Sequence, residues 1–323
     1  MDAMKRSFGY DAMDVQQGRE GSPVREKPPA WKIVTAFAAL YVIWGTTYLA
    51  IGMMVKTIPP YLGAGSRFLA AGTLLYAFLR LRGAPNPAPR QWGWAALAGL
   101  LLLVGGNGSI VWAQKTVPSG IASIIVATEP LWIVVVSWLL FKGGRPTLLE
   151  GAGILGGFAG MAFLVGPSML AHGRGIDPFG AGLLVFATIS WAFGSMVSRH
   201  ADLPDSAPMA MSMEMTVAGI AMLLLAFPKG DWAQFSLSAV SRTSFMGWLY
   251  LIVFGSWVGF VAFFFVMRHC RPSRASTYAY VNPVIAVFLG WLVAGEPLTG
   301  RILVSAAVIL ASVAIVVTFS PKS

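Results

Sequence analysis

An acidic residue and a proline stand side by side in the middle of the apolar stretch 118–142. A charged side chain at bilayer depth costs at least ~2.5 kcal/mol, so we expect Glu129 to face protein or water rather than lipid. Pro130 lacks the backbone N–H that a helix needs at that depth, which predicts a break in the helix. A later apolar stretch repeats this pattern with Asn282-Pro283. Two broken helices in corresponding positions are typical of transporters whose binding site lies between two repeats.

Composition places the chain among membrane proteins. Of its 323 residues, 56% are hydrophobic and only 11% are charged, whereas a soluble domain carries about a quarter charged residues. The net charge of +10 would suggest a nucleic-acid partner in a soluble chain. Here the basic residues fall in the tail and loops, where they set topology, so we expect no nucleic-acid binding. The one cysteine excludes an intrachain disulfide and a cysteine metal cluster, and the three histidines fall in predicted loops, so we expect neither a metal nor a cofactor.

Ten apolar segments are each about the ~20 residues that a helix needs to cross a bilayer. They are 33–54, 61–80, 92–113, 120–141, 149–166, 178–197, 208–228, 245–266, 274–294 and 301–319. The polar tail 1–31 mixes acidic and basic residues, which is typical of disorder, and it lacks the apolar core of a signal peptide. Most lysines and arginines lie on the side of this tail, so both termini are expected in the cytoplasm. The sequence therefore predicts an all-α, multi-pass protein of the inner (plasma) membrane.

The second half of the chain repeats features of the first. Residue pairs separated by nearly the same interval are Trp44 and Trp191, Arg67 and Glu214, and Pro130 and Pro283. After the tail 1–31, the segments 32–166 and 167–320 are therefore predicted to form two five-helix repeats. Because five is odd, the second repeat enters the membrane from the opposite side, which is the inverted topology of many secondary transporters.

Two charged residues lie inside predicted spans, near opposite faces of the membrane. Arg67 is roughly six residues into a span entered from outside, and Glu214 is roughly six into one entered from the cytoplasm, so each lies ~9 Å from its face. We therefore do not expect them to pair, and we interpret both as structural anchors or gate contacts. Glu129 and Asn282 fall near the middle of their spans and are the better candidates for a shared central site.

Several motifs, in this order and spacing, resemble one known family. They are Trp44-Gly45, Ser66-Arg67-Phe68, the Pro130 and Pro283 spans, Tyr280-Val281-Asn282-Pro283, Gly290-Trp291 and Gly295-Glu296-Pro297-Leu298-Thr299. Together they resemble the EamA-type carriers of the drug/metabolite transporter superfamily over essentially everything after the tail. The resemblance implies a ten-helix inner-membrane carrier, often an exporter of amino acids and other metabolites. It also implies a central cavity lined mainly by spans one, three, four, six, eight and nine.

One position departs from the family pattern. The second half has Glu296 after its proline span, where the first half has Arg145. A symmetric role for Glu296 is therefore not expected, and we interpret it as a loop cap or a gate contact.

The candidate substrate-binding side chains are mostly aromatic, with two amides and one carboxylate. They are Trp44, Tyr48, Asn107, Glu129, Trp191, Tyr278, Tyr280 and Asn282, with Pro130 and Pro283 as helix-break hinges. Such a wall suits a small amphipathic solute and can hold an ammonium group by cation–π attraction. The two tryptophans could instead serve packing or the interface belt, which is the interpretation we favour for Trp112.

Glu129 has two interpretations. It could bind the amine of a substrate or carry a coupling proton, which is the only ion coupling that the sequence suggests. Alternatively, it could be a protonated acid that bonds to a neighbouring serine or to freed backbone. We favour the functional role, because ionisable groups inside the membrane are expensive to keep there.

A secondary carrier that exports amino acids or related amphipathic metabolites explains the repeat and the central prolines. Efflux of drugs or lipophilic cations is the alternative, followed by an importer, a channel or a membrane protein without transport activity. An intramembrane enzyme is not expected, because no membrane histidine is present to activate Ser109. The expected partners are a small-molecule solute and the lipid bilayer. A monomer is compatible with the sequence, which leaves the oligomeric state, substrate and direction open.

Overall fold

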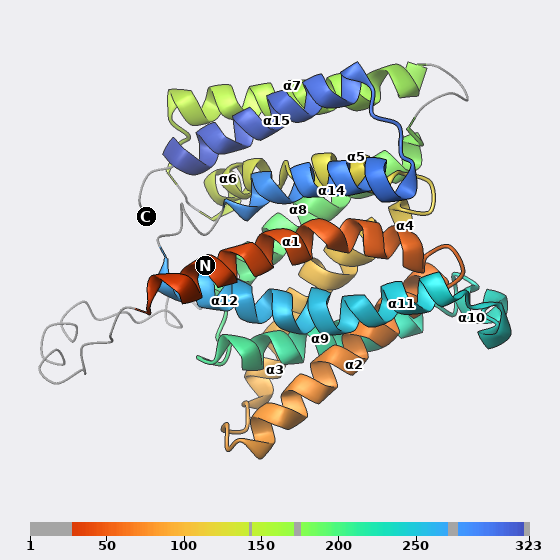
Figure 1. Ribbon diagram of the computed structural model, residues 1–323. Coiled ribbons are helices and arrows are strands. Elements are labelled where there is room, and N and C mark those ends of the chain that lie inside the picture. Colours follow the sequence, from red (N-terminus) through yellow and green to blue (C-terminus); the bar gives the residue numbers. More distant parts are fainter. Residues whose placement is uncertain (1–27, 142–143, 171–175, 271–276, 320–323) are drawn as a thin grey trace, which may run out of the picture.

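The computed structural model describes residues 28–141, 144–170, 176–270 and 277–319, and every regular element within these ranges is helical (Figure 1). In this part of the chain, nine helices are long and apolar enough to cross a membrane, and Tyr278–Ala294 is apolar but shorter, with 17 residues. The predicted start of that segment, residue 274, lies outside the described residues. So do residues 1–27, most of the tail that is predicted to be disordered.

The helices follow the predicted spans, several of which consist of consecutive pieces. In chain order they are α1 (Ala30–Met54), α2 (Pro60–Leu81), α3 (Pro89–Gly99) with the π-helix η2 (Leu100–Gly108) and α4 (Ser109–Ala113), α5 (Ser119–Val126) and α6 (Glu129–Leu140), α7 (Leu148–Leu170), α8 (Pro178–His200), α9 (Ala207–Leu225), α10 (Asp231–Gln234), the 3₁₀ turn η3 (Leu237–Ala239), α11 (Arg242–Tyr250) with the π-helix η4 (Leu251–Val258) and α12 (Gly259–His269), α14 (Tyr278–Ala294) and α15 (Gly300–Phe319). The sequence did not predict α10 and η3, which lie in a loop.

The helices pack in pairs that relate the two halves of the chain. α2 packs along α9, and α7 packs along α15 as an outer layer (Figure 1). α1 contacts α14 and the α11–α12 span, while α8 contacts α6 and the η2 span. α1 begins and α15 ends at the same end of the bundle (Figure 1). That placement is the one expected for an even number of crossings.

The two predicted hinge prolines differ in their effect. Helix α5 ends at Val126 and α6 begins at Glu129, with Pro130 in its first turn, so the first break is present. Pro283, by contrast, lies inside the continuous helix α14. The prediction of a broken helix there was therefore wrong. Proline removes one backbone hydrogen bond from α14, and next to it the helix packs tightly against Gly45 of α1, where an added Cβ would lie 2.8 Å from Ile285.

Glycines bring α2 and α9 into backbone contact. A Cβ added at Gly72 would lie 2.6 Å from the Thr216 backbone nitrogen, and one added at Gly219 would lie 2.4 Å from that of Leu69. Small residues allow membrane helices to approach in this way. The glycines of α7 likewise allow it to pack closely against α15. Helix α7 contributes no described residue to the cavity described below.

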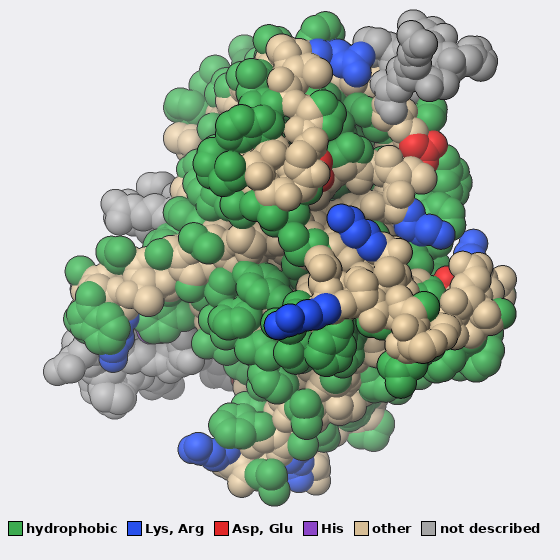
Figure 2. All heavy atoms as spheres, turned by 45° about the vertical axis from the view of Figure 1, so that its right-hand side comes forward, with side chains coloured by type: hydrophobic (Ala, Val, Ile, Leu, Met, Phe, Trp, Pro, Cys, Tyr) green, Lys and Arg blue, Asp and Glu red, His purple; other side chains and the backbone are tan. Residues whose placement is uncertain are grey.

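Most of the visible surface is hydrophobic, as expected for helices that face lipid (Figure 2). Exposed large apolar side chains include Leu74, Phe163, Phe186, Leu224 and Phe288, each from a different helix. Without a bilayer such a surface would mark an aggregation-prone protein, so the fold requires a lipid environment.

Carboxylates cap helix ends at the end of the bundle that holds the 54–60 and 113–119 loops. Asp231 accepts hydrogen bonds from the backbone N–H groups of Tyr61 and Leu62 at the start of α2. Asp177 caps α8 and accepts a 2.7 Å hydrogen bond from the Thr116 hydroxyl. That hydroxyl, together with the capped backbone, holds the pKa of Asp177 below its ordinary value. The cap is therefore formed at neutral pH, and its stabilisation is lost as the pH falls through the lowered pKa.

Glu296 joins the two halves of the chain. Its carboxylate accepts hydrogen bonds from the Ser119 N–H (2.7 Å), the Ser119 hydroxyl (2.7 Å) and the Gly120 N–H (2.9 Å) at the start of α5. A carboxylate is favoured at a helix N-terminus, where free N–H groups and the helix dipole both attract it. The expected role as a cap is confirmed. An arginine such as Arg145 has no acceptor and cannot make this contact.

Replacing Gly72 by alanine should destabilise the protein by about 1–3 kcal/mol, because the new Cβ overlaps backbone that cannot move aside. We expect a lower midpoint of thermal unfolding in detergent. The midpoint is measured from the reaction of Cys270 with a thiol-reactive dye, or from the loss of the monodisperse peak in size-exclusion chromatography after heating. Gly151→Ala is the matched control, because no atom lies within 4 Å of the added Cβ. Equal midpoints for the two variants would contradict the packing argument.

Glu296→Ala should lower the free energy of unfolding by about 0.5–2 kcal/mol, since three donors at the start of α5 lose their acceptor. Glu296→Gln should lie between this variant and the native protein, because it keeps one acceptor oxygen. Asp205→Asn, at an exposed loop position, is the control. Thermal unfolding in detergent measures all four proteins, and a native-like Glu296→Ala would contradict the assigned cap.

Candidate substrate-binding cavity

Helices from both halves enclose a cavity of about 110 Å³, comparable with cavities that admit one small organic molecule. Its walls come from α1, α2, η2, α4, the α5–α6 break, α8, the η4–α12 junction and α14. Spans one, three, four, six, eight and nine, which the family resemblance named, all contribute. Span two contributes as well.

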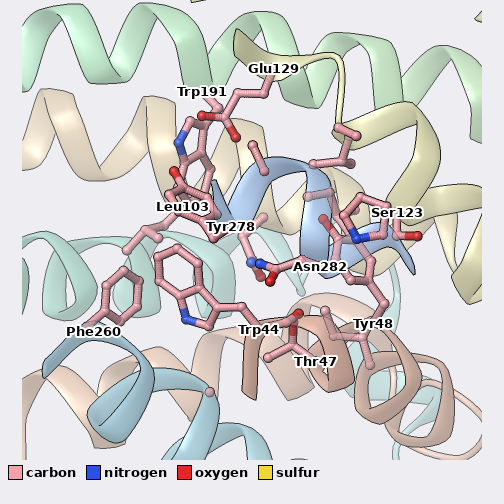
Figure 3. A pocket seen from close by; sticks show the side chains of 18 of the residues that line it. Trp44, Thr47, Tyr48, Leu103, Ser123, Glu129, Trp191, Phe260, Tyr278 and Asn282 are labelled. Atoms are coloured by element: carbon pink, nitrogen blue, oxygen red, sulfur yellow. The ribbon is translucent and has the colours of Figure 1, made fainter. Parts of the chain in front are cut away.

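The structure brings together most of the side chains predicted to bind substrate. Those that line the cavity are Trp44, Tyr48, Asn107, Glu129, Trp191, Tyr278 and Asn282, together with Pro130 and Pro283. Glu129 and Trp191 lie on one side of it, and Trp44 and Thr47 on the opposite side (Figure 3). Residues that are far apart in the sequence thus share one space.

Tyr280 does not line the cavity, and its inclusion in the predicted site was wrong. Tyr278 and Asn282 are four residues apart on α14 and share one face of the helix. Tyr280 lies midway between them and therefore points elsewhere. The helical period alone could have excluded it, had a continuous helix been assumed across Pro283.

Aromatic rings form one wall of the cavity. The Trp44 indole stacks on Phe263 at 5.2 Å between ring centroids and meets Tyr278 and Phe260 edge-on, each at 5.3 Å. Such offset and edge-to-face arrangements are the favoured ones for aromatic pairs. Trp112, in contrast, does not line the cavity and packs against Phe179 near the end of its span, which agrees with a place in the interface belt.

Glycines at the π-helices make room for the two cavity tryptophans. A Cβ at Gly106, within η2, would lie 2.8 Å from Trp191, and one at Gly259, directly after η4, would lie 2.4 Å from the Trp44 ring nitrogen. Any side chain at either position would push the tryptophan out of place. π-helical segments are rare and frequent at functional sites, and both of these line the cavity.

Three side chains present free acceptor groups to the cavity. Among the described residues, the Oδ1 atoms of Asn107 and Asn282 have no hydrogen-bond partner. The Glu129 carboxyl likewise makes no hydrogen bond to a described residue, and it interacts electrostatically with the hydroxyl groups of Tyr48 and Tyr278. The structural interpretation of Glu129 required a bond to a serine or to freed backbone, and no such bond is present among the described residues.

Arg67 and Glu214 have different surroundings, although the sequence placed them in equivalent positions. Glu214 is buried away from the cavity, with Ser198 as a 3.5 Å hydrogen-bond donor. Arg67 lines the cavity, which its interpretation as an anchor or gate contact did not foresee. The sequence estimate counted depth along the helix but could not tell which side of α2 faces the cavity. The two residues form no ion pair, as expected.

Some cavity residues were not predicted. Phe68, Ser123, Gly255 and Phe260 line the cavity from α2, α5, η4 and α12. Gly255 and Phe260 lie in a span without charged or amide groups, so only a π-helix, which sequence patterns do not indicate, turns them inward. Ser123 is a small polar residue two turns before Glu129, which was a usable signal.

Comparison with known proteins identifies the family of the chain. The model of the EamA-like transporter family matches the chain twice, over residues 31–166 and 178–318. The chain belongs to the EamA-like transporter family. It is 42% identical, over 82% of its length and 83% of the relative's, to the Escherichia coli K12 protein named uncharacterized inner membrane transporter YedA. It is 27% identical to the WAT1-related protein At3g02690, chloroplastic, of Arabidopsis thaliana, over 87% of this chain and 68% of that one.

A solved crystal structure has the same fold. Its chain superposes with a TM-score of 0.60 and 21% identity, over 92% of this chain and 100% of the other. This EamA-family chain is therefore a multi-pass inner-membrane protein and a transporter rather than an enzyme. The family membership leaves its substrate open.

Proposed function

We propose that this EamA-family transporter is a secondary active carrier that exports amino acids or related small amphipathic metabolites. The observation that carries the proposal is the central cavity, in which aromatic rings from both halves surround the Glu129 carboxyl and the amide oxygens of Asn107 and Asn282, for which no partner is present among the described residues. Aromatic faces attract an ammonium ion and an apolar side chain, while Glu129, Asn107 and Asn282 would accept the hydrogen bonds of the ammonium.

Alternating access would follow from an inverted repeat. In this proposal, the nine long spans and the shorter α14 cross the membrane as ten helices, five in each half, with both termini in the cytoplasm. The paired contacts α2–α9 and α7–α15 support such a symmetry, as do the matching glycines at Gly72 and Gly219. The two halves would rock about the cavity, and the α5–α6 break beside Pro130 would act as a hinge.

Glu129 would couple transport to protons. A carboxyl group that has no hydrogen-bond partner and faces a cavity can exchange a proton and a substrate ammonium in turn. Export would then draw on the proton gradient, because the proton and the substrate compete for the same oxygen atoms.

Efflux of drugs or lipophilic cations is the second candidate. Glu129 and the tryptophans would serve it equally well, and the cavity size favours a small solute. Exchange in liposomes separates the two candidates. Purified protein is reconstituted in vesicles preloaded with unlabelled amino acids, and entry of labelled amino acids is measured. Saturable entry supports the proposal, whereas no entry in intact vesicles, with uptake of a lipophilic cation instead, supports the second candidate.

Glu129→Gln should abolish the pH dependence of transport, since glutamine cannot bind and release the coupling proton. Initial rates of labelled amino acid exchange and of proton-driven uptake are compared at acidic and alkaline external pH. The native protein should respond to pH and the variant should not. Glu214→Gln is the control, because Glu214 is buried outside the cavity. A pH response that survives in Glu129→Gln would exclude this residue as the proton carrier.

Tyr278→Phe should raise the half-saturation concentration severalfold, because a hydroxyl group is removed from the cavity wall. Tyr280→Phe, two residues away and outside the cavity, should leave it unchanged. Saturation curves of amino acid exchange at equal protein content give both values. Equal effects of the two substitutions would contradict the assignment of this cavity as the binding site.

A further inference from the structure

The geometry points to a second recognition element: we propose that Arg67 binds the carboxylate of the transported solute. This inference rests on the proposed function and narrows it to solutes that carry an acid group. The Arg67 side chain is 3% exposed, yet it lines the central cavity from α2. The guanidinium group is positively charged at any physiological pH, so it brings a fixed cation into the same space as Glu129.

The guanidinium is held in a fixed position. Its Nε donates a 3.2 Å hydrogen bond to the Ser256 hydroxyl, which in turn donates to the Leu251 carbonyl at 3.1 Å, within the π-helix η4. The guanidinium carbon lies 4.5 Å from the centre of the Phe68 ring, a cation–π distance. An arginine that is held in this way loses little conformational entropy when it binds a ligand.

One nitrogen at the end of the side chain has no hydrogen-bond partner among the described residues. Nη1 is buried and makes no hydrogen bond, and Arg67 forms no ion pair with any residue that the structure describes. Buried polar atoms are nearly always hydrogen-bonded, and a buried charge without a counter-ion is costly. A ligand carboxylate would satisfy both needs, because its two oxygens match the arginine fork.

A glycine lies beside the guanidinium at the cavity wall. Gly255 lines the cavity without a side chain, and a Cβ there would lie 3.5 Å from Nη2 and 3.3 Å from the Thr47 methyl carbon. A side chain at position 255 would therefore contact Nη2, whereas the glycine leaves that position to a ligand, and Thr47 also lines the cavity there. η4 supplies both the serine that holds Arg67 and the glycine that opens the space next to it.

The charged and polar groups of the cavity together indicate which class of solute would fit. The cavity offers a cation at Arg67 and acceptors at Glu129, Asn107 and Asn282, which is the complement of a molecule with both a carboxylate and an ammonium group. A lipophilic cation would leave Arg67 unpaired and would be repelled by it. The arginine therefore favours zwitterionic amino acids over simple cations.

The test uses four probes with the same ring: phenylalanine, 3-phenylpropionate (carboxylate only), 3-phenylpropanamide (a neutral isostere of the carboxylate) and phenethylamine (ammonium only). Binding to the full-length protein in detergent is measured by calorimetric titration. The native protein should bind 3-phenylpropionate at least tenfold more tightly than the amide. Arg67→Gln should abolish this preference and leave the affinity for phenethylamine unchanged. Glu129→Gln should lower the affinity for phenethylamine.

Equal affinity of the native protein for 3-phenylpropionate and its amide would overturn the proposal, even if Arg67→Gln fails to fold. So would an Arg67→Gln variant that keeps the preference. Arg67→Lys, which retains the charge without the fork, should keep part of the preference. A purely structural arginine would lower the thermal midpoint of the variants without changing the ratio of the two affinities.

Exchange in liposomes distinguishes this inference from the proposed function. If phenylalanine and the other amino acids fail to exchange, but 3-phenylpropionate binds in an Arg67-dependent manner, the proposed transport of amino acids fails and the carboxylate site stands. If amino acids exchange equally well in the native protein and in Arg67→Gln, the site fails and the proposed function stands.

Discussion

Backbone polar groups inside a bilayer must find their partners within the protein, and the rest of this structure depends on that constraint. It requires helices wherever the chain faces lipid. Departures from regular α-helix, namely the break between α5 and α6, the π-helices η2 and η4, and Pro283 within α14, all occur at the cavity. Irregular backbone is tolerated there because protein surrounds it, and the same irregularity turns side chains such as Glu129 inward.

Close approach of helices decides which side chains can reach the cavity. The glycine contacts between α2 and α9 fix the position of α2, and with it Arg67. Gly106 and Gly259 leave room for the two tryptophans, which would otherwise clash with the η2 and η4 spans. Packing and recognition therefore use the same residues, and a substitution at one of these glycines would move a cavity wall as well as loosen the bundle.

The polar groups of the protein are divided between two tasks. At the helix ends, carboxylates such as Glu296 and Asp231 are fully hydrogen-bonded to backbone N–H groups and stabilise the fold. In the cavity, Arg67, Asn107 and Asn282 keep atoms without partners. Such atoms lower stability, and a bound solute would regain that energy. Buried atoms without partners also occur outside the cavity, at Gln114, Trp132 and Ser305, so it is the convergence of Arg67, Asn107 and Asn282 on one cavity that makes them candidates for ligand binding.

The sequence by itself determined the membrane class, the approximate spans and nine of the residues that line the cavity, because apolar length, intramembrane charge and proline carry strong local signals. Only the tertiary structure decided which face of each helix points inward. For this reason Tyr280 was placed in the cavity wrongly and Arg67 was not placed there, since both assignments depend on the rotation of a helix about its axis. The contributions of Gly255 and Phe260 depend on the π-helix η4, which leaves no recognisable pattern in the sequence. Helix rotation is fixed by contacts between residues far apart in the chain, and those contacts exist only in the folded protein.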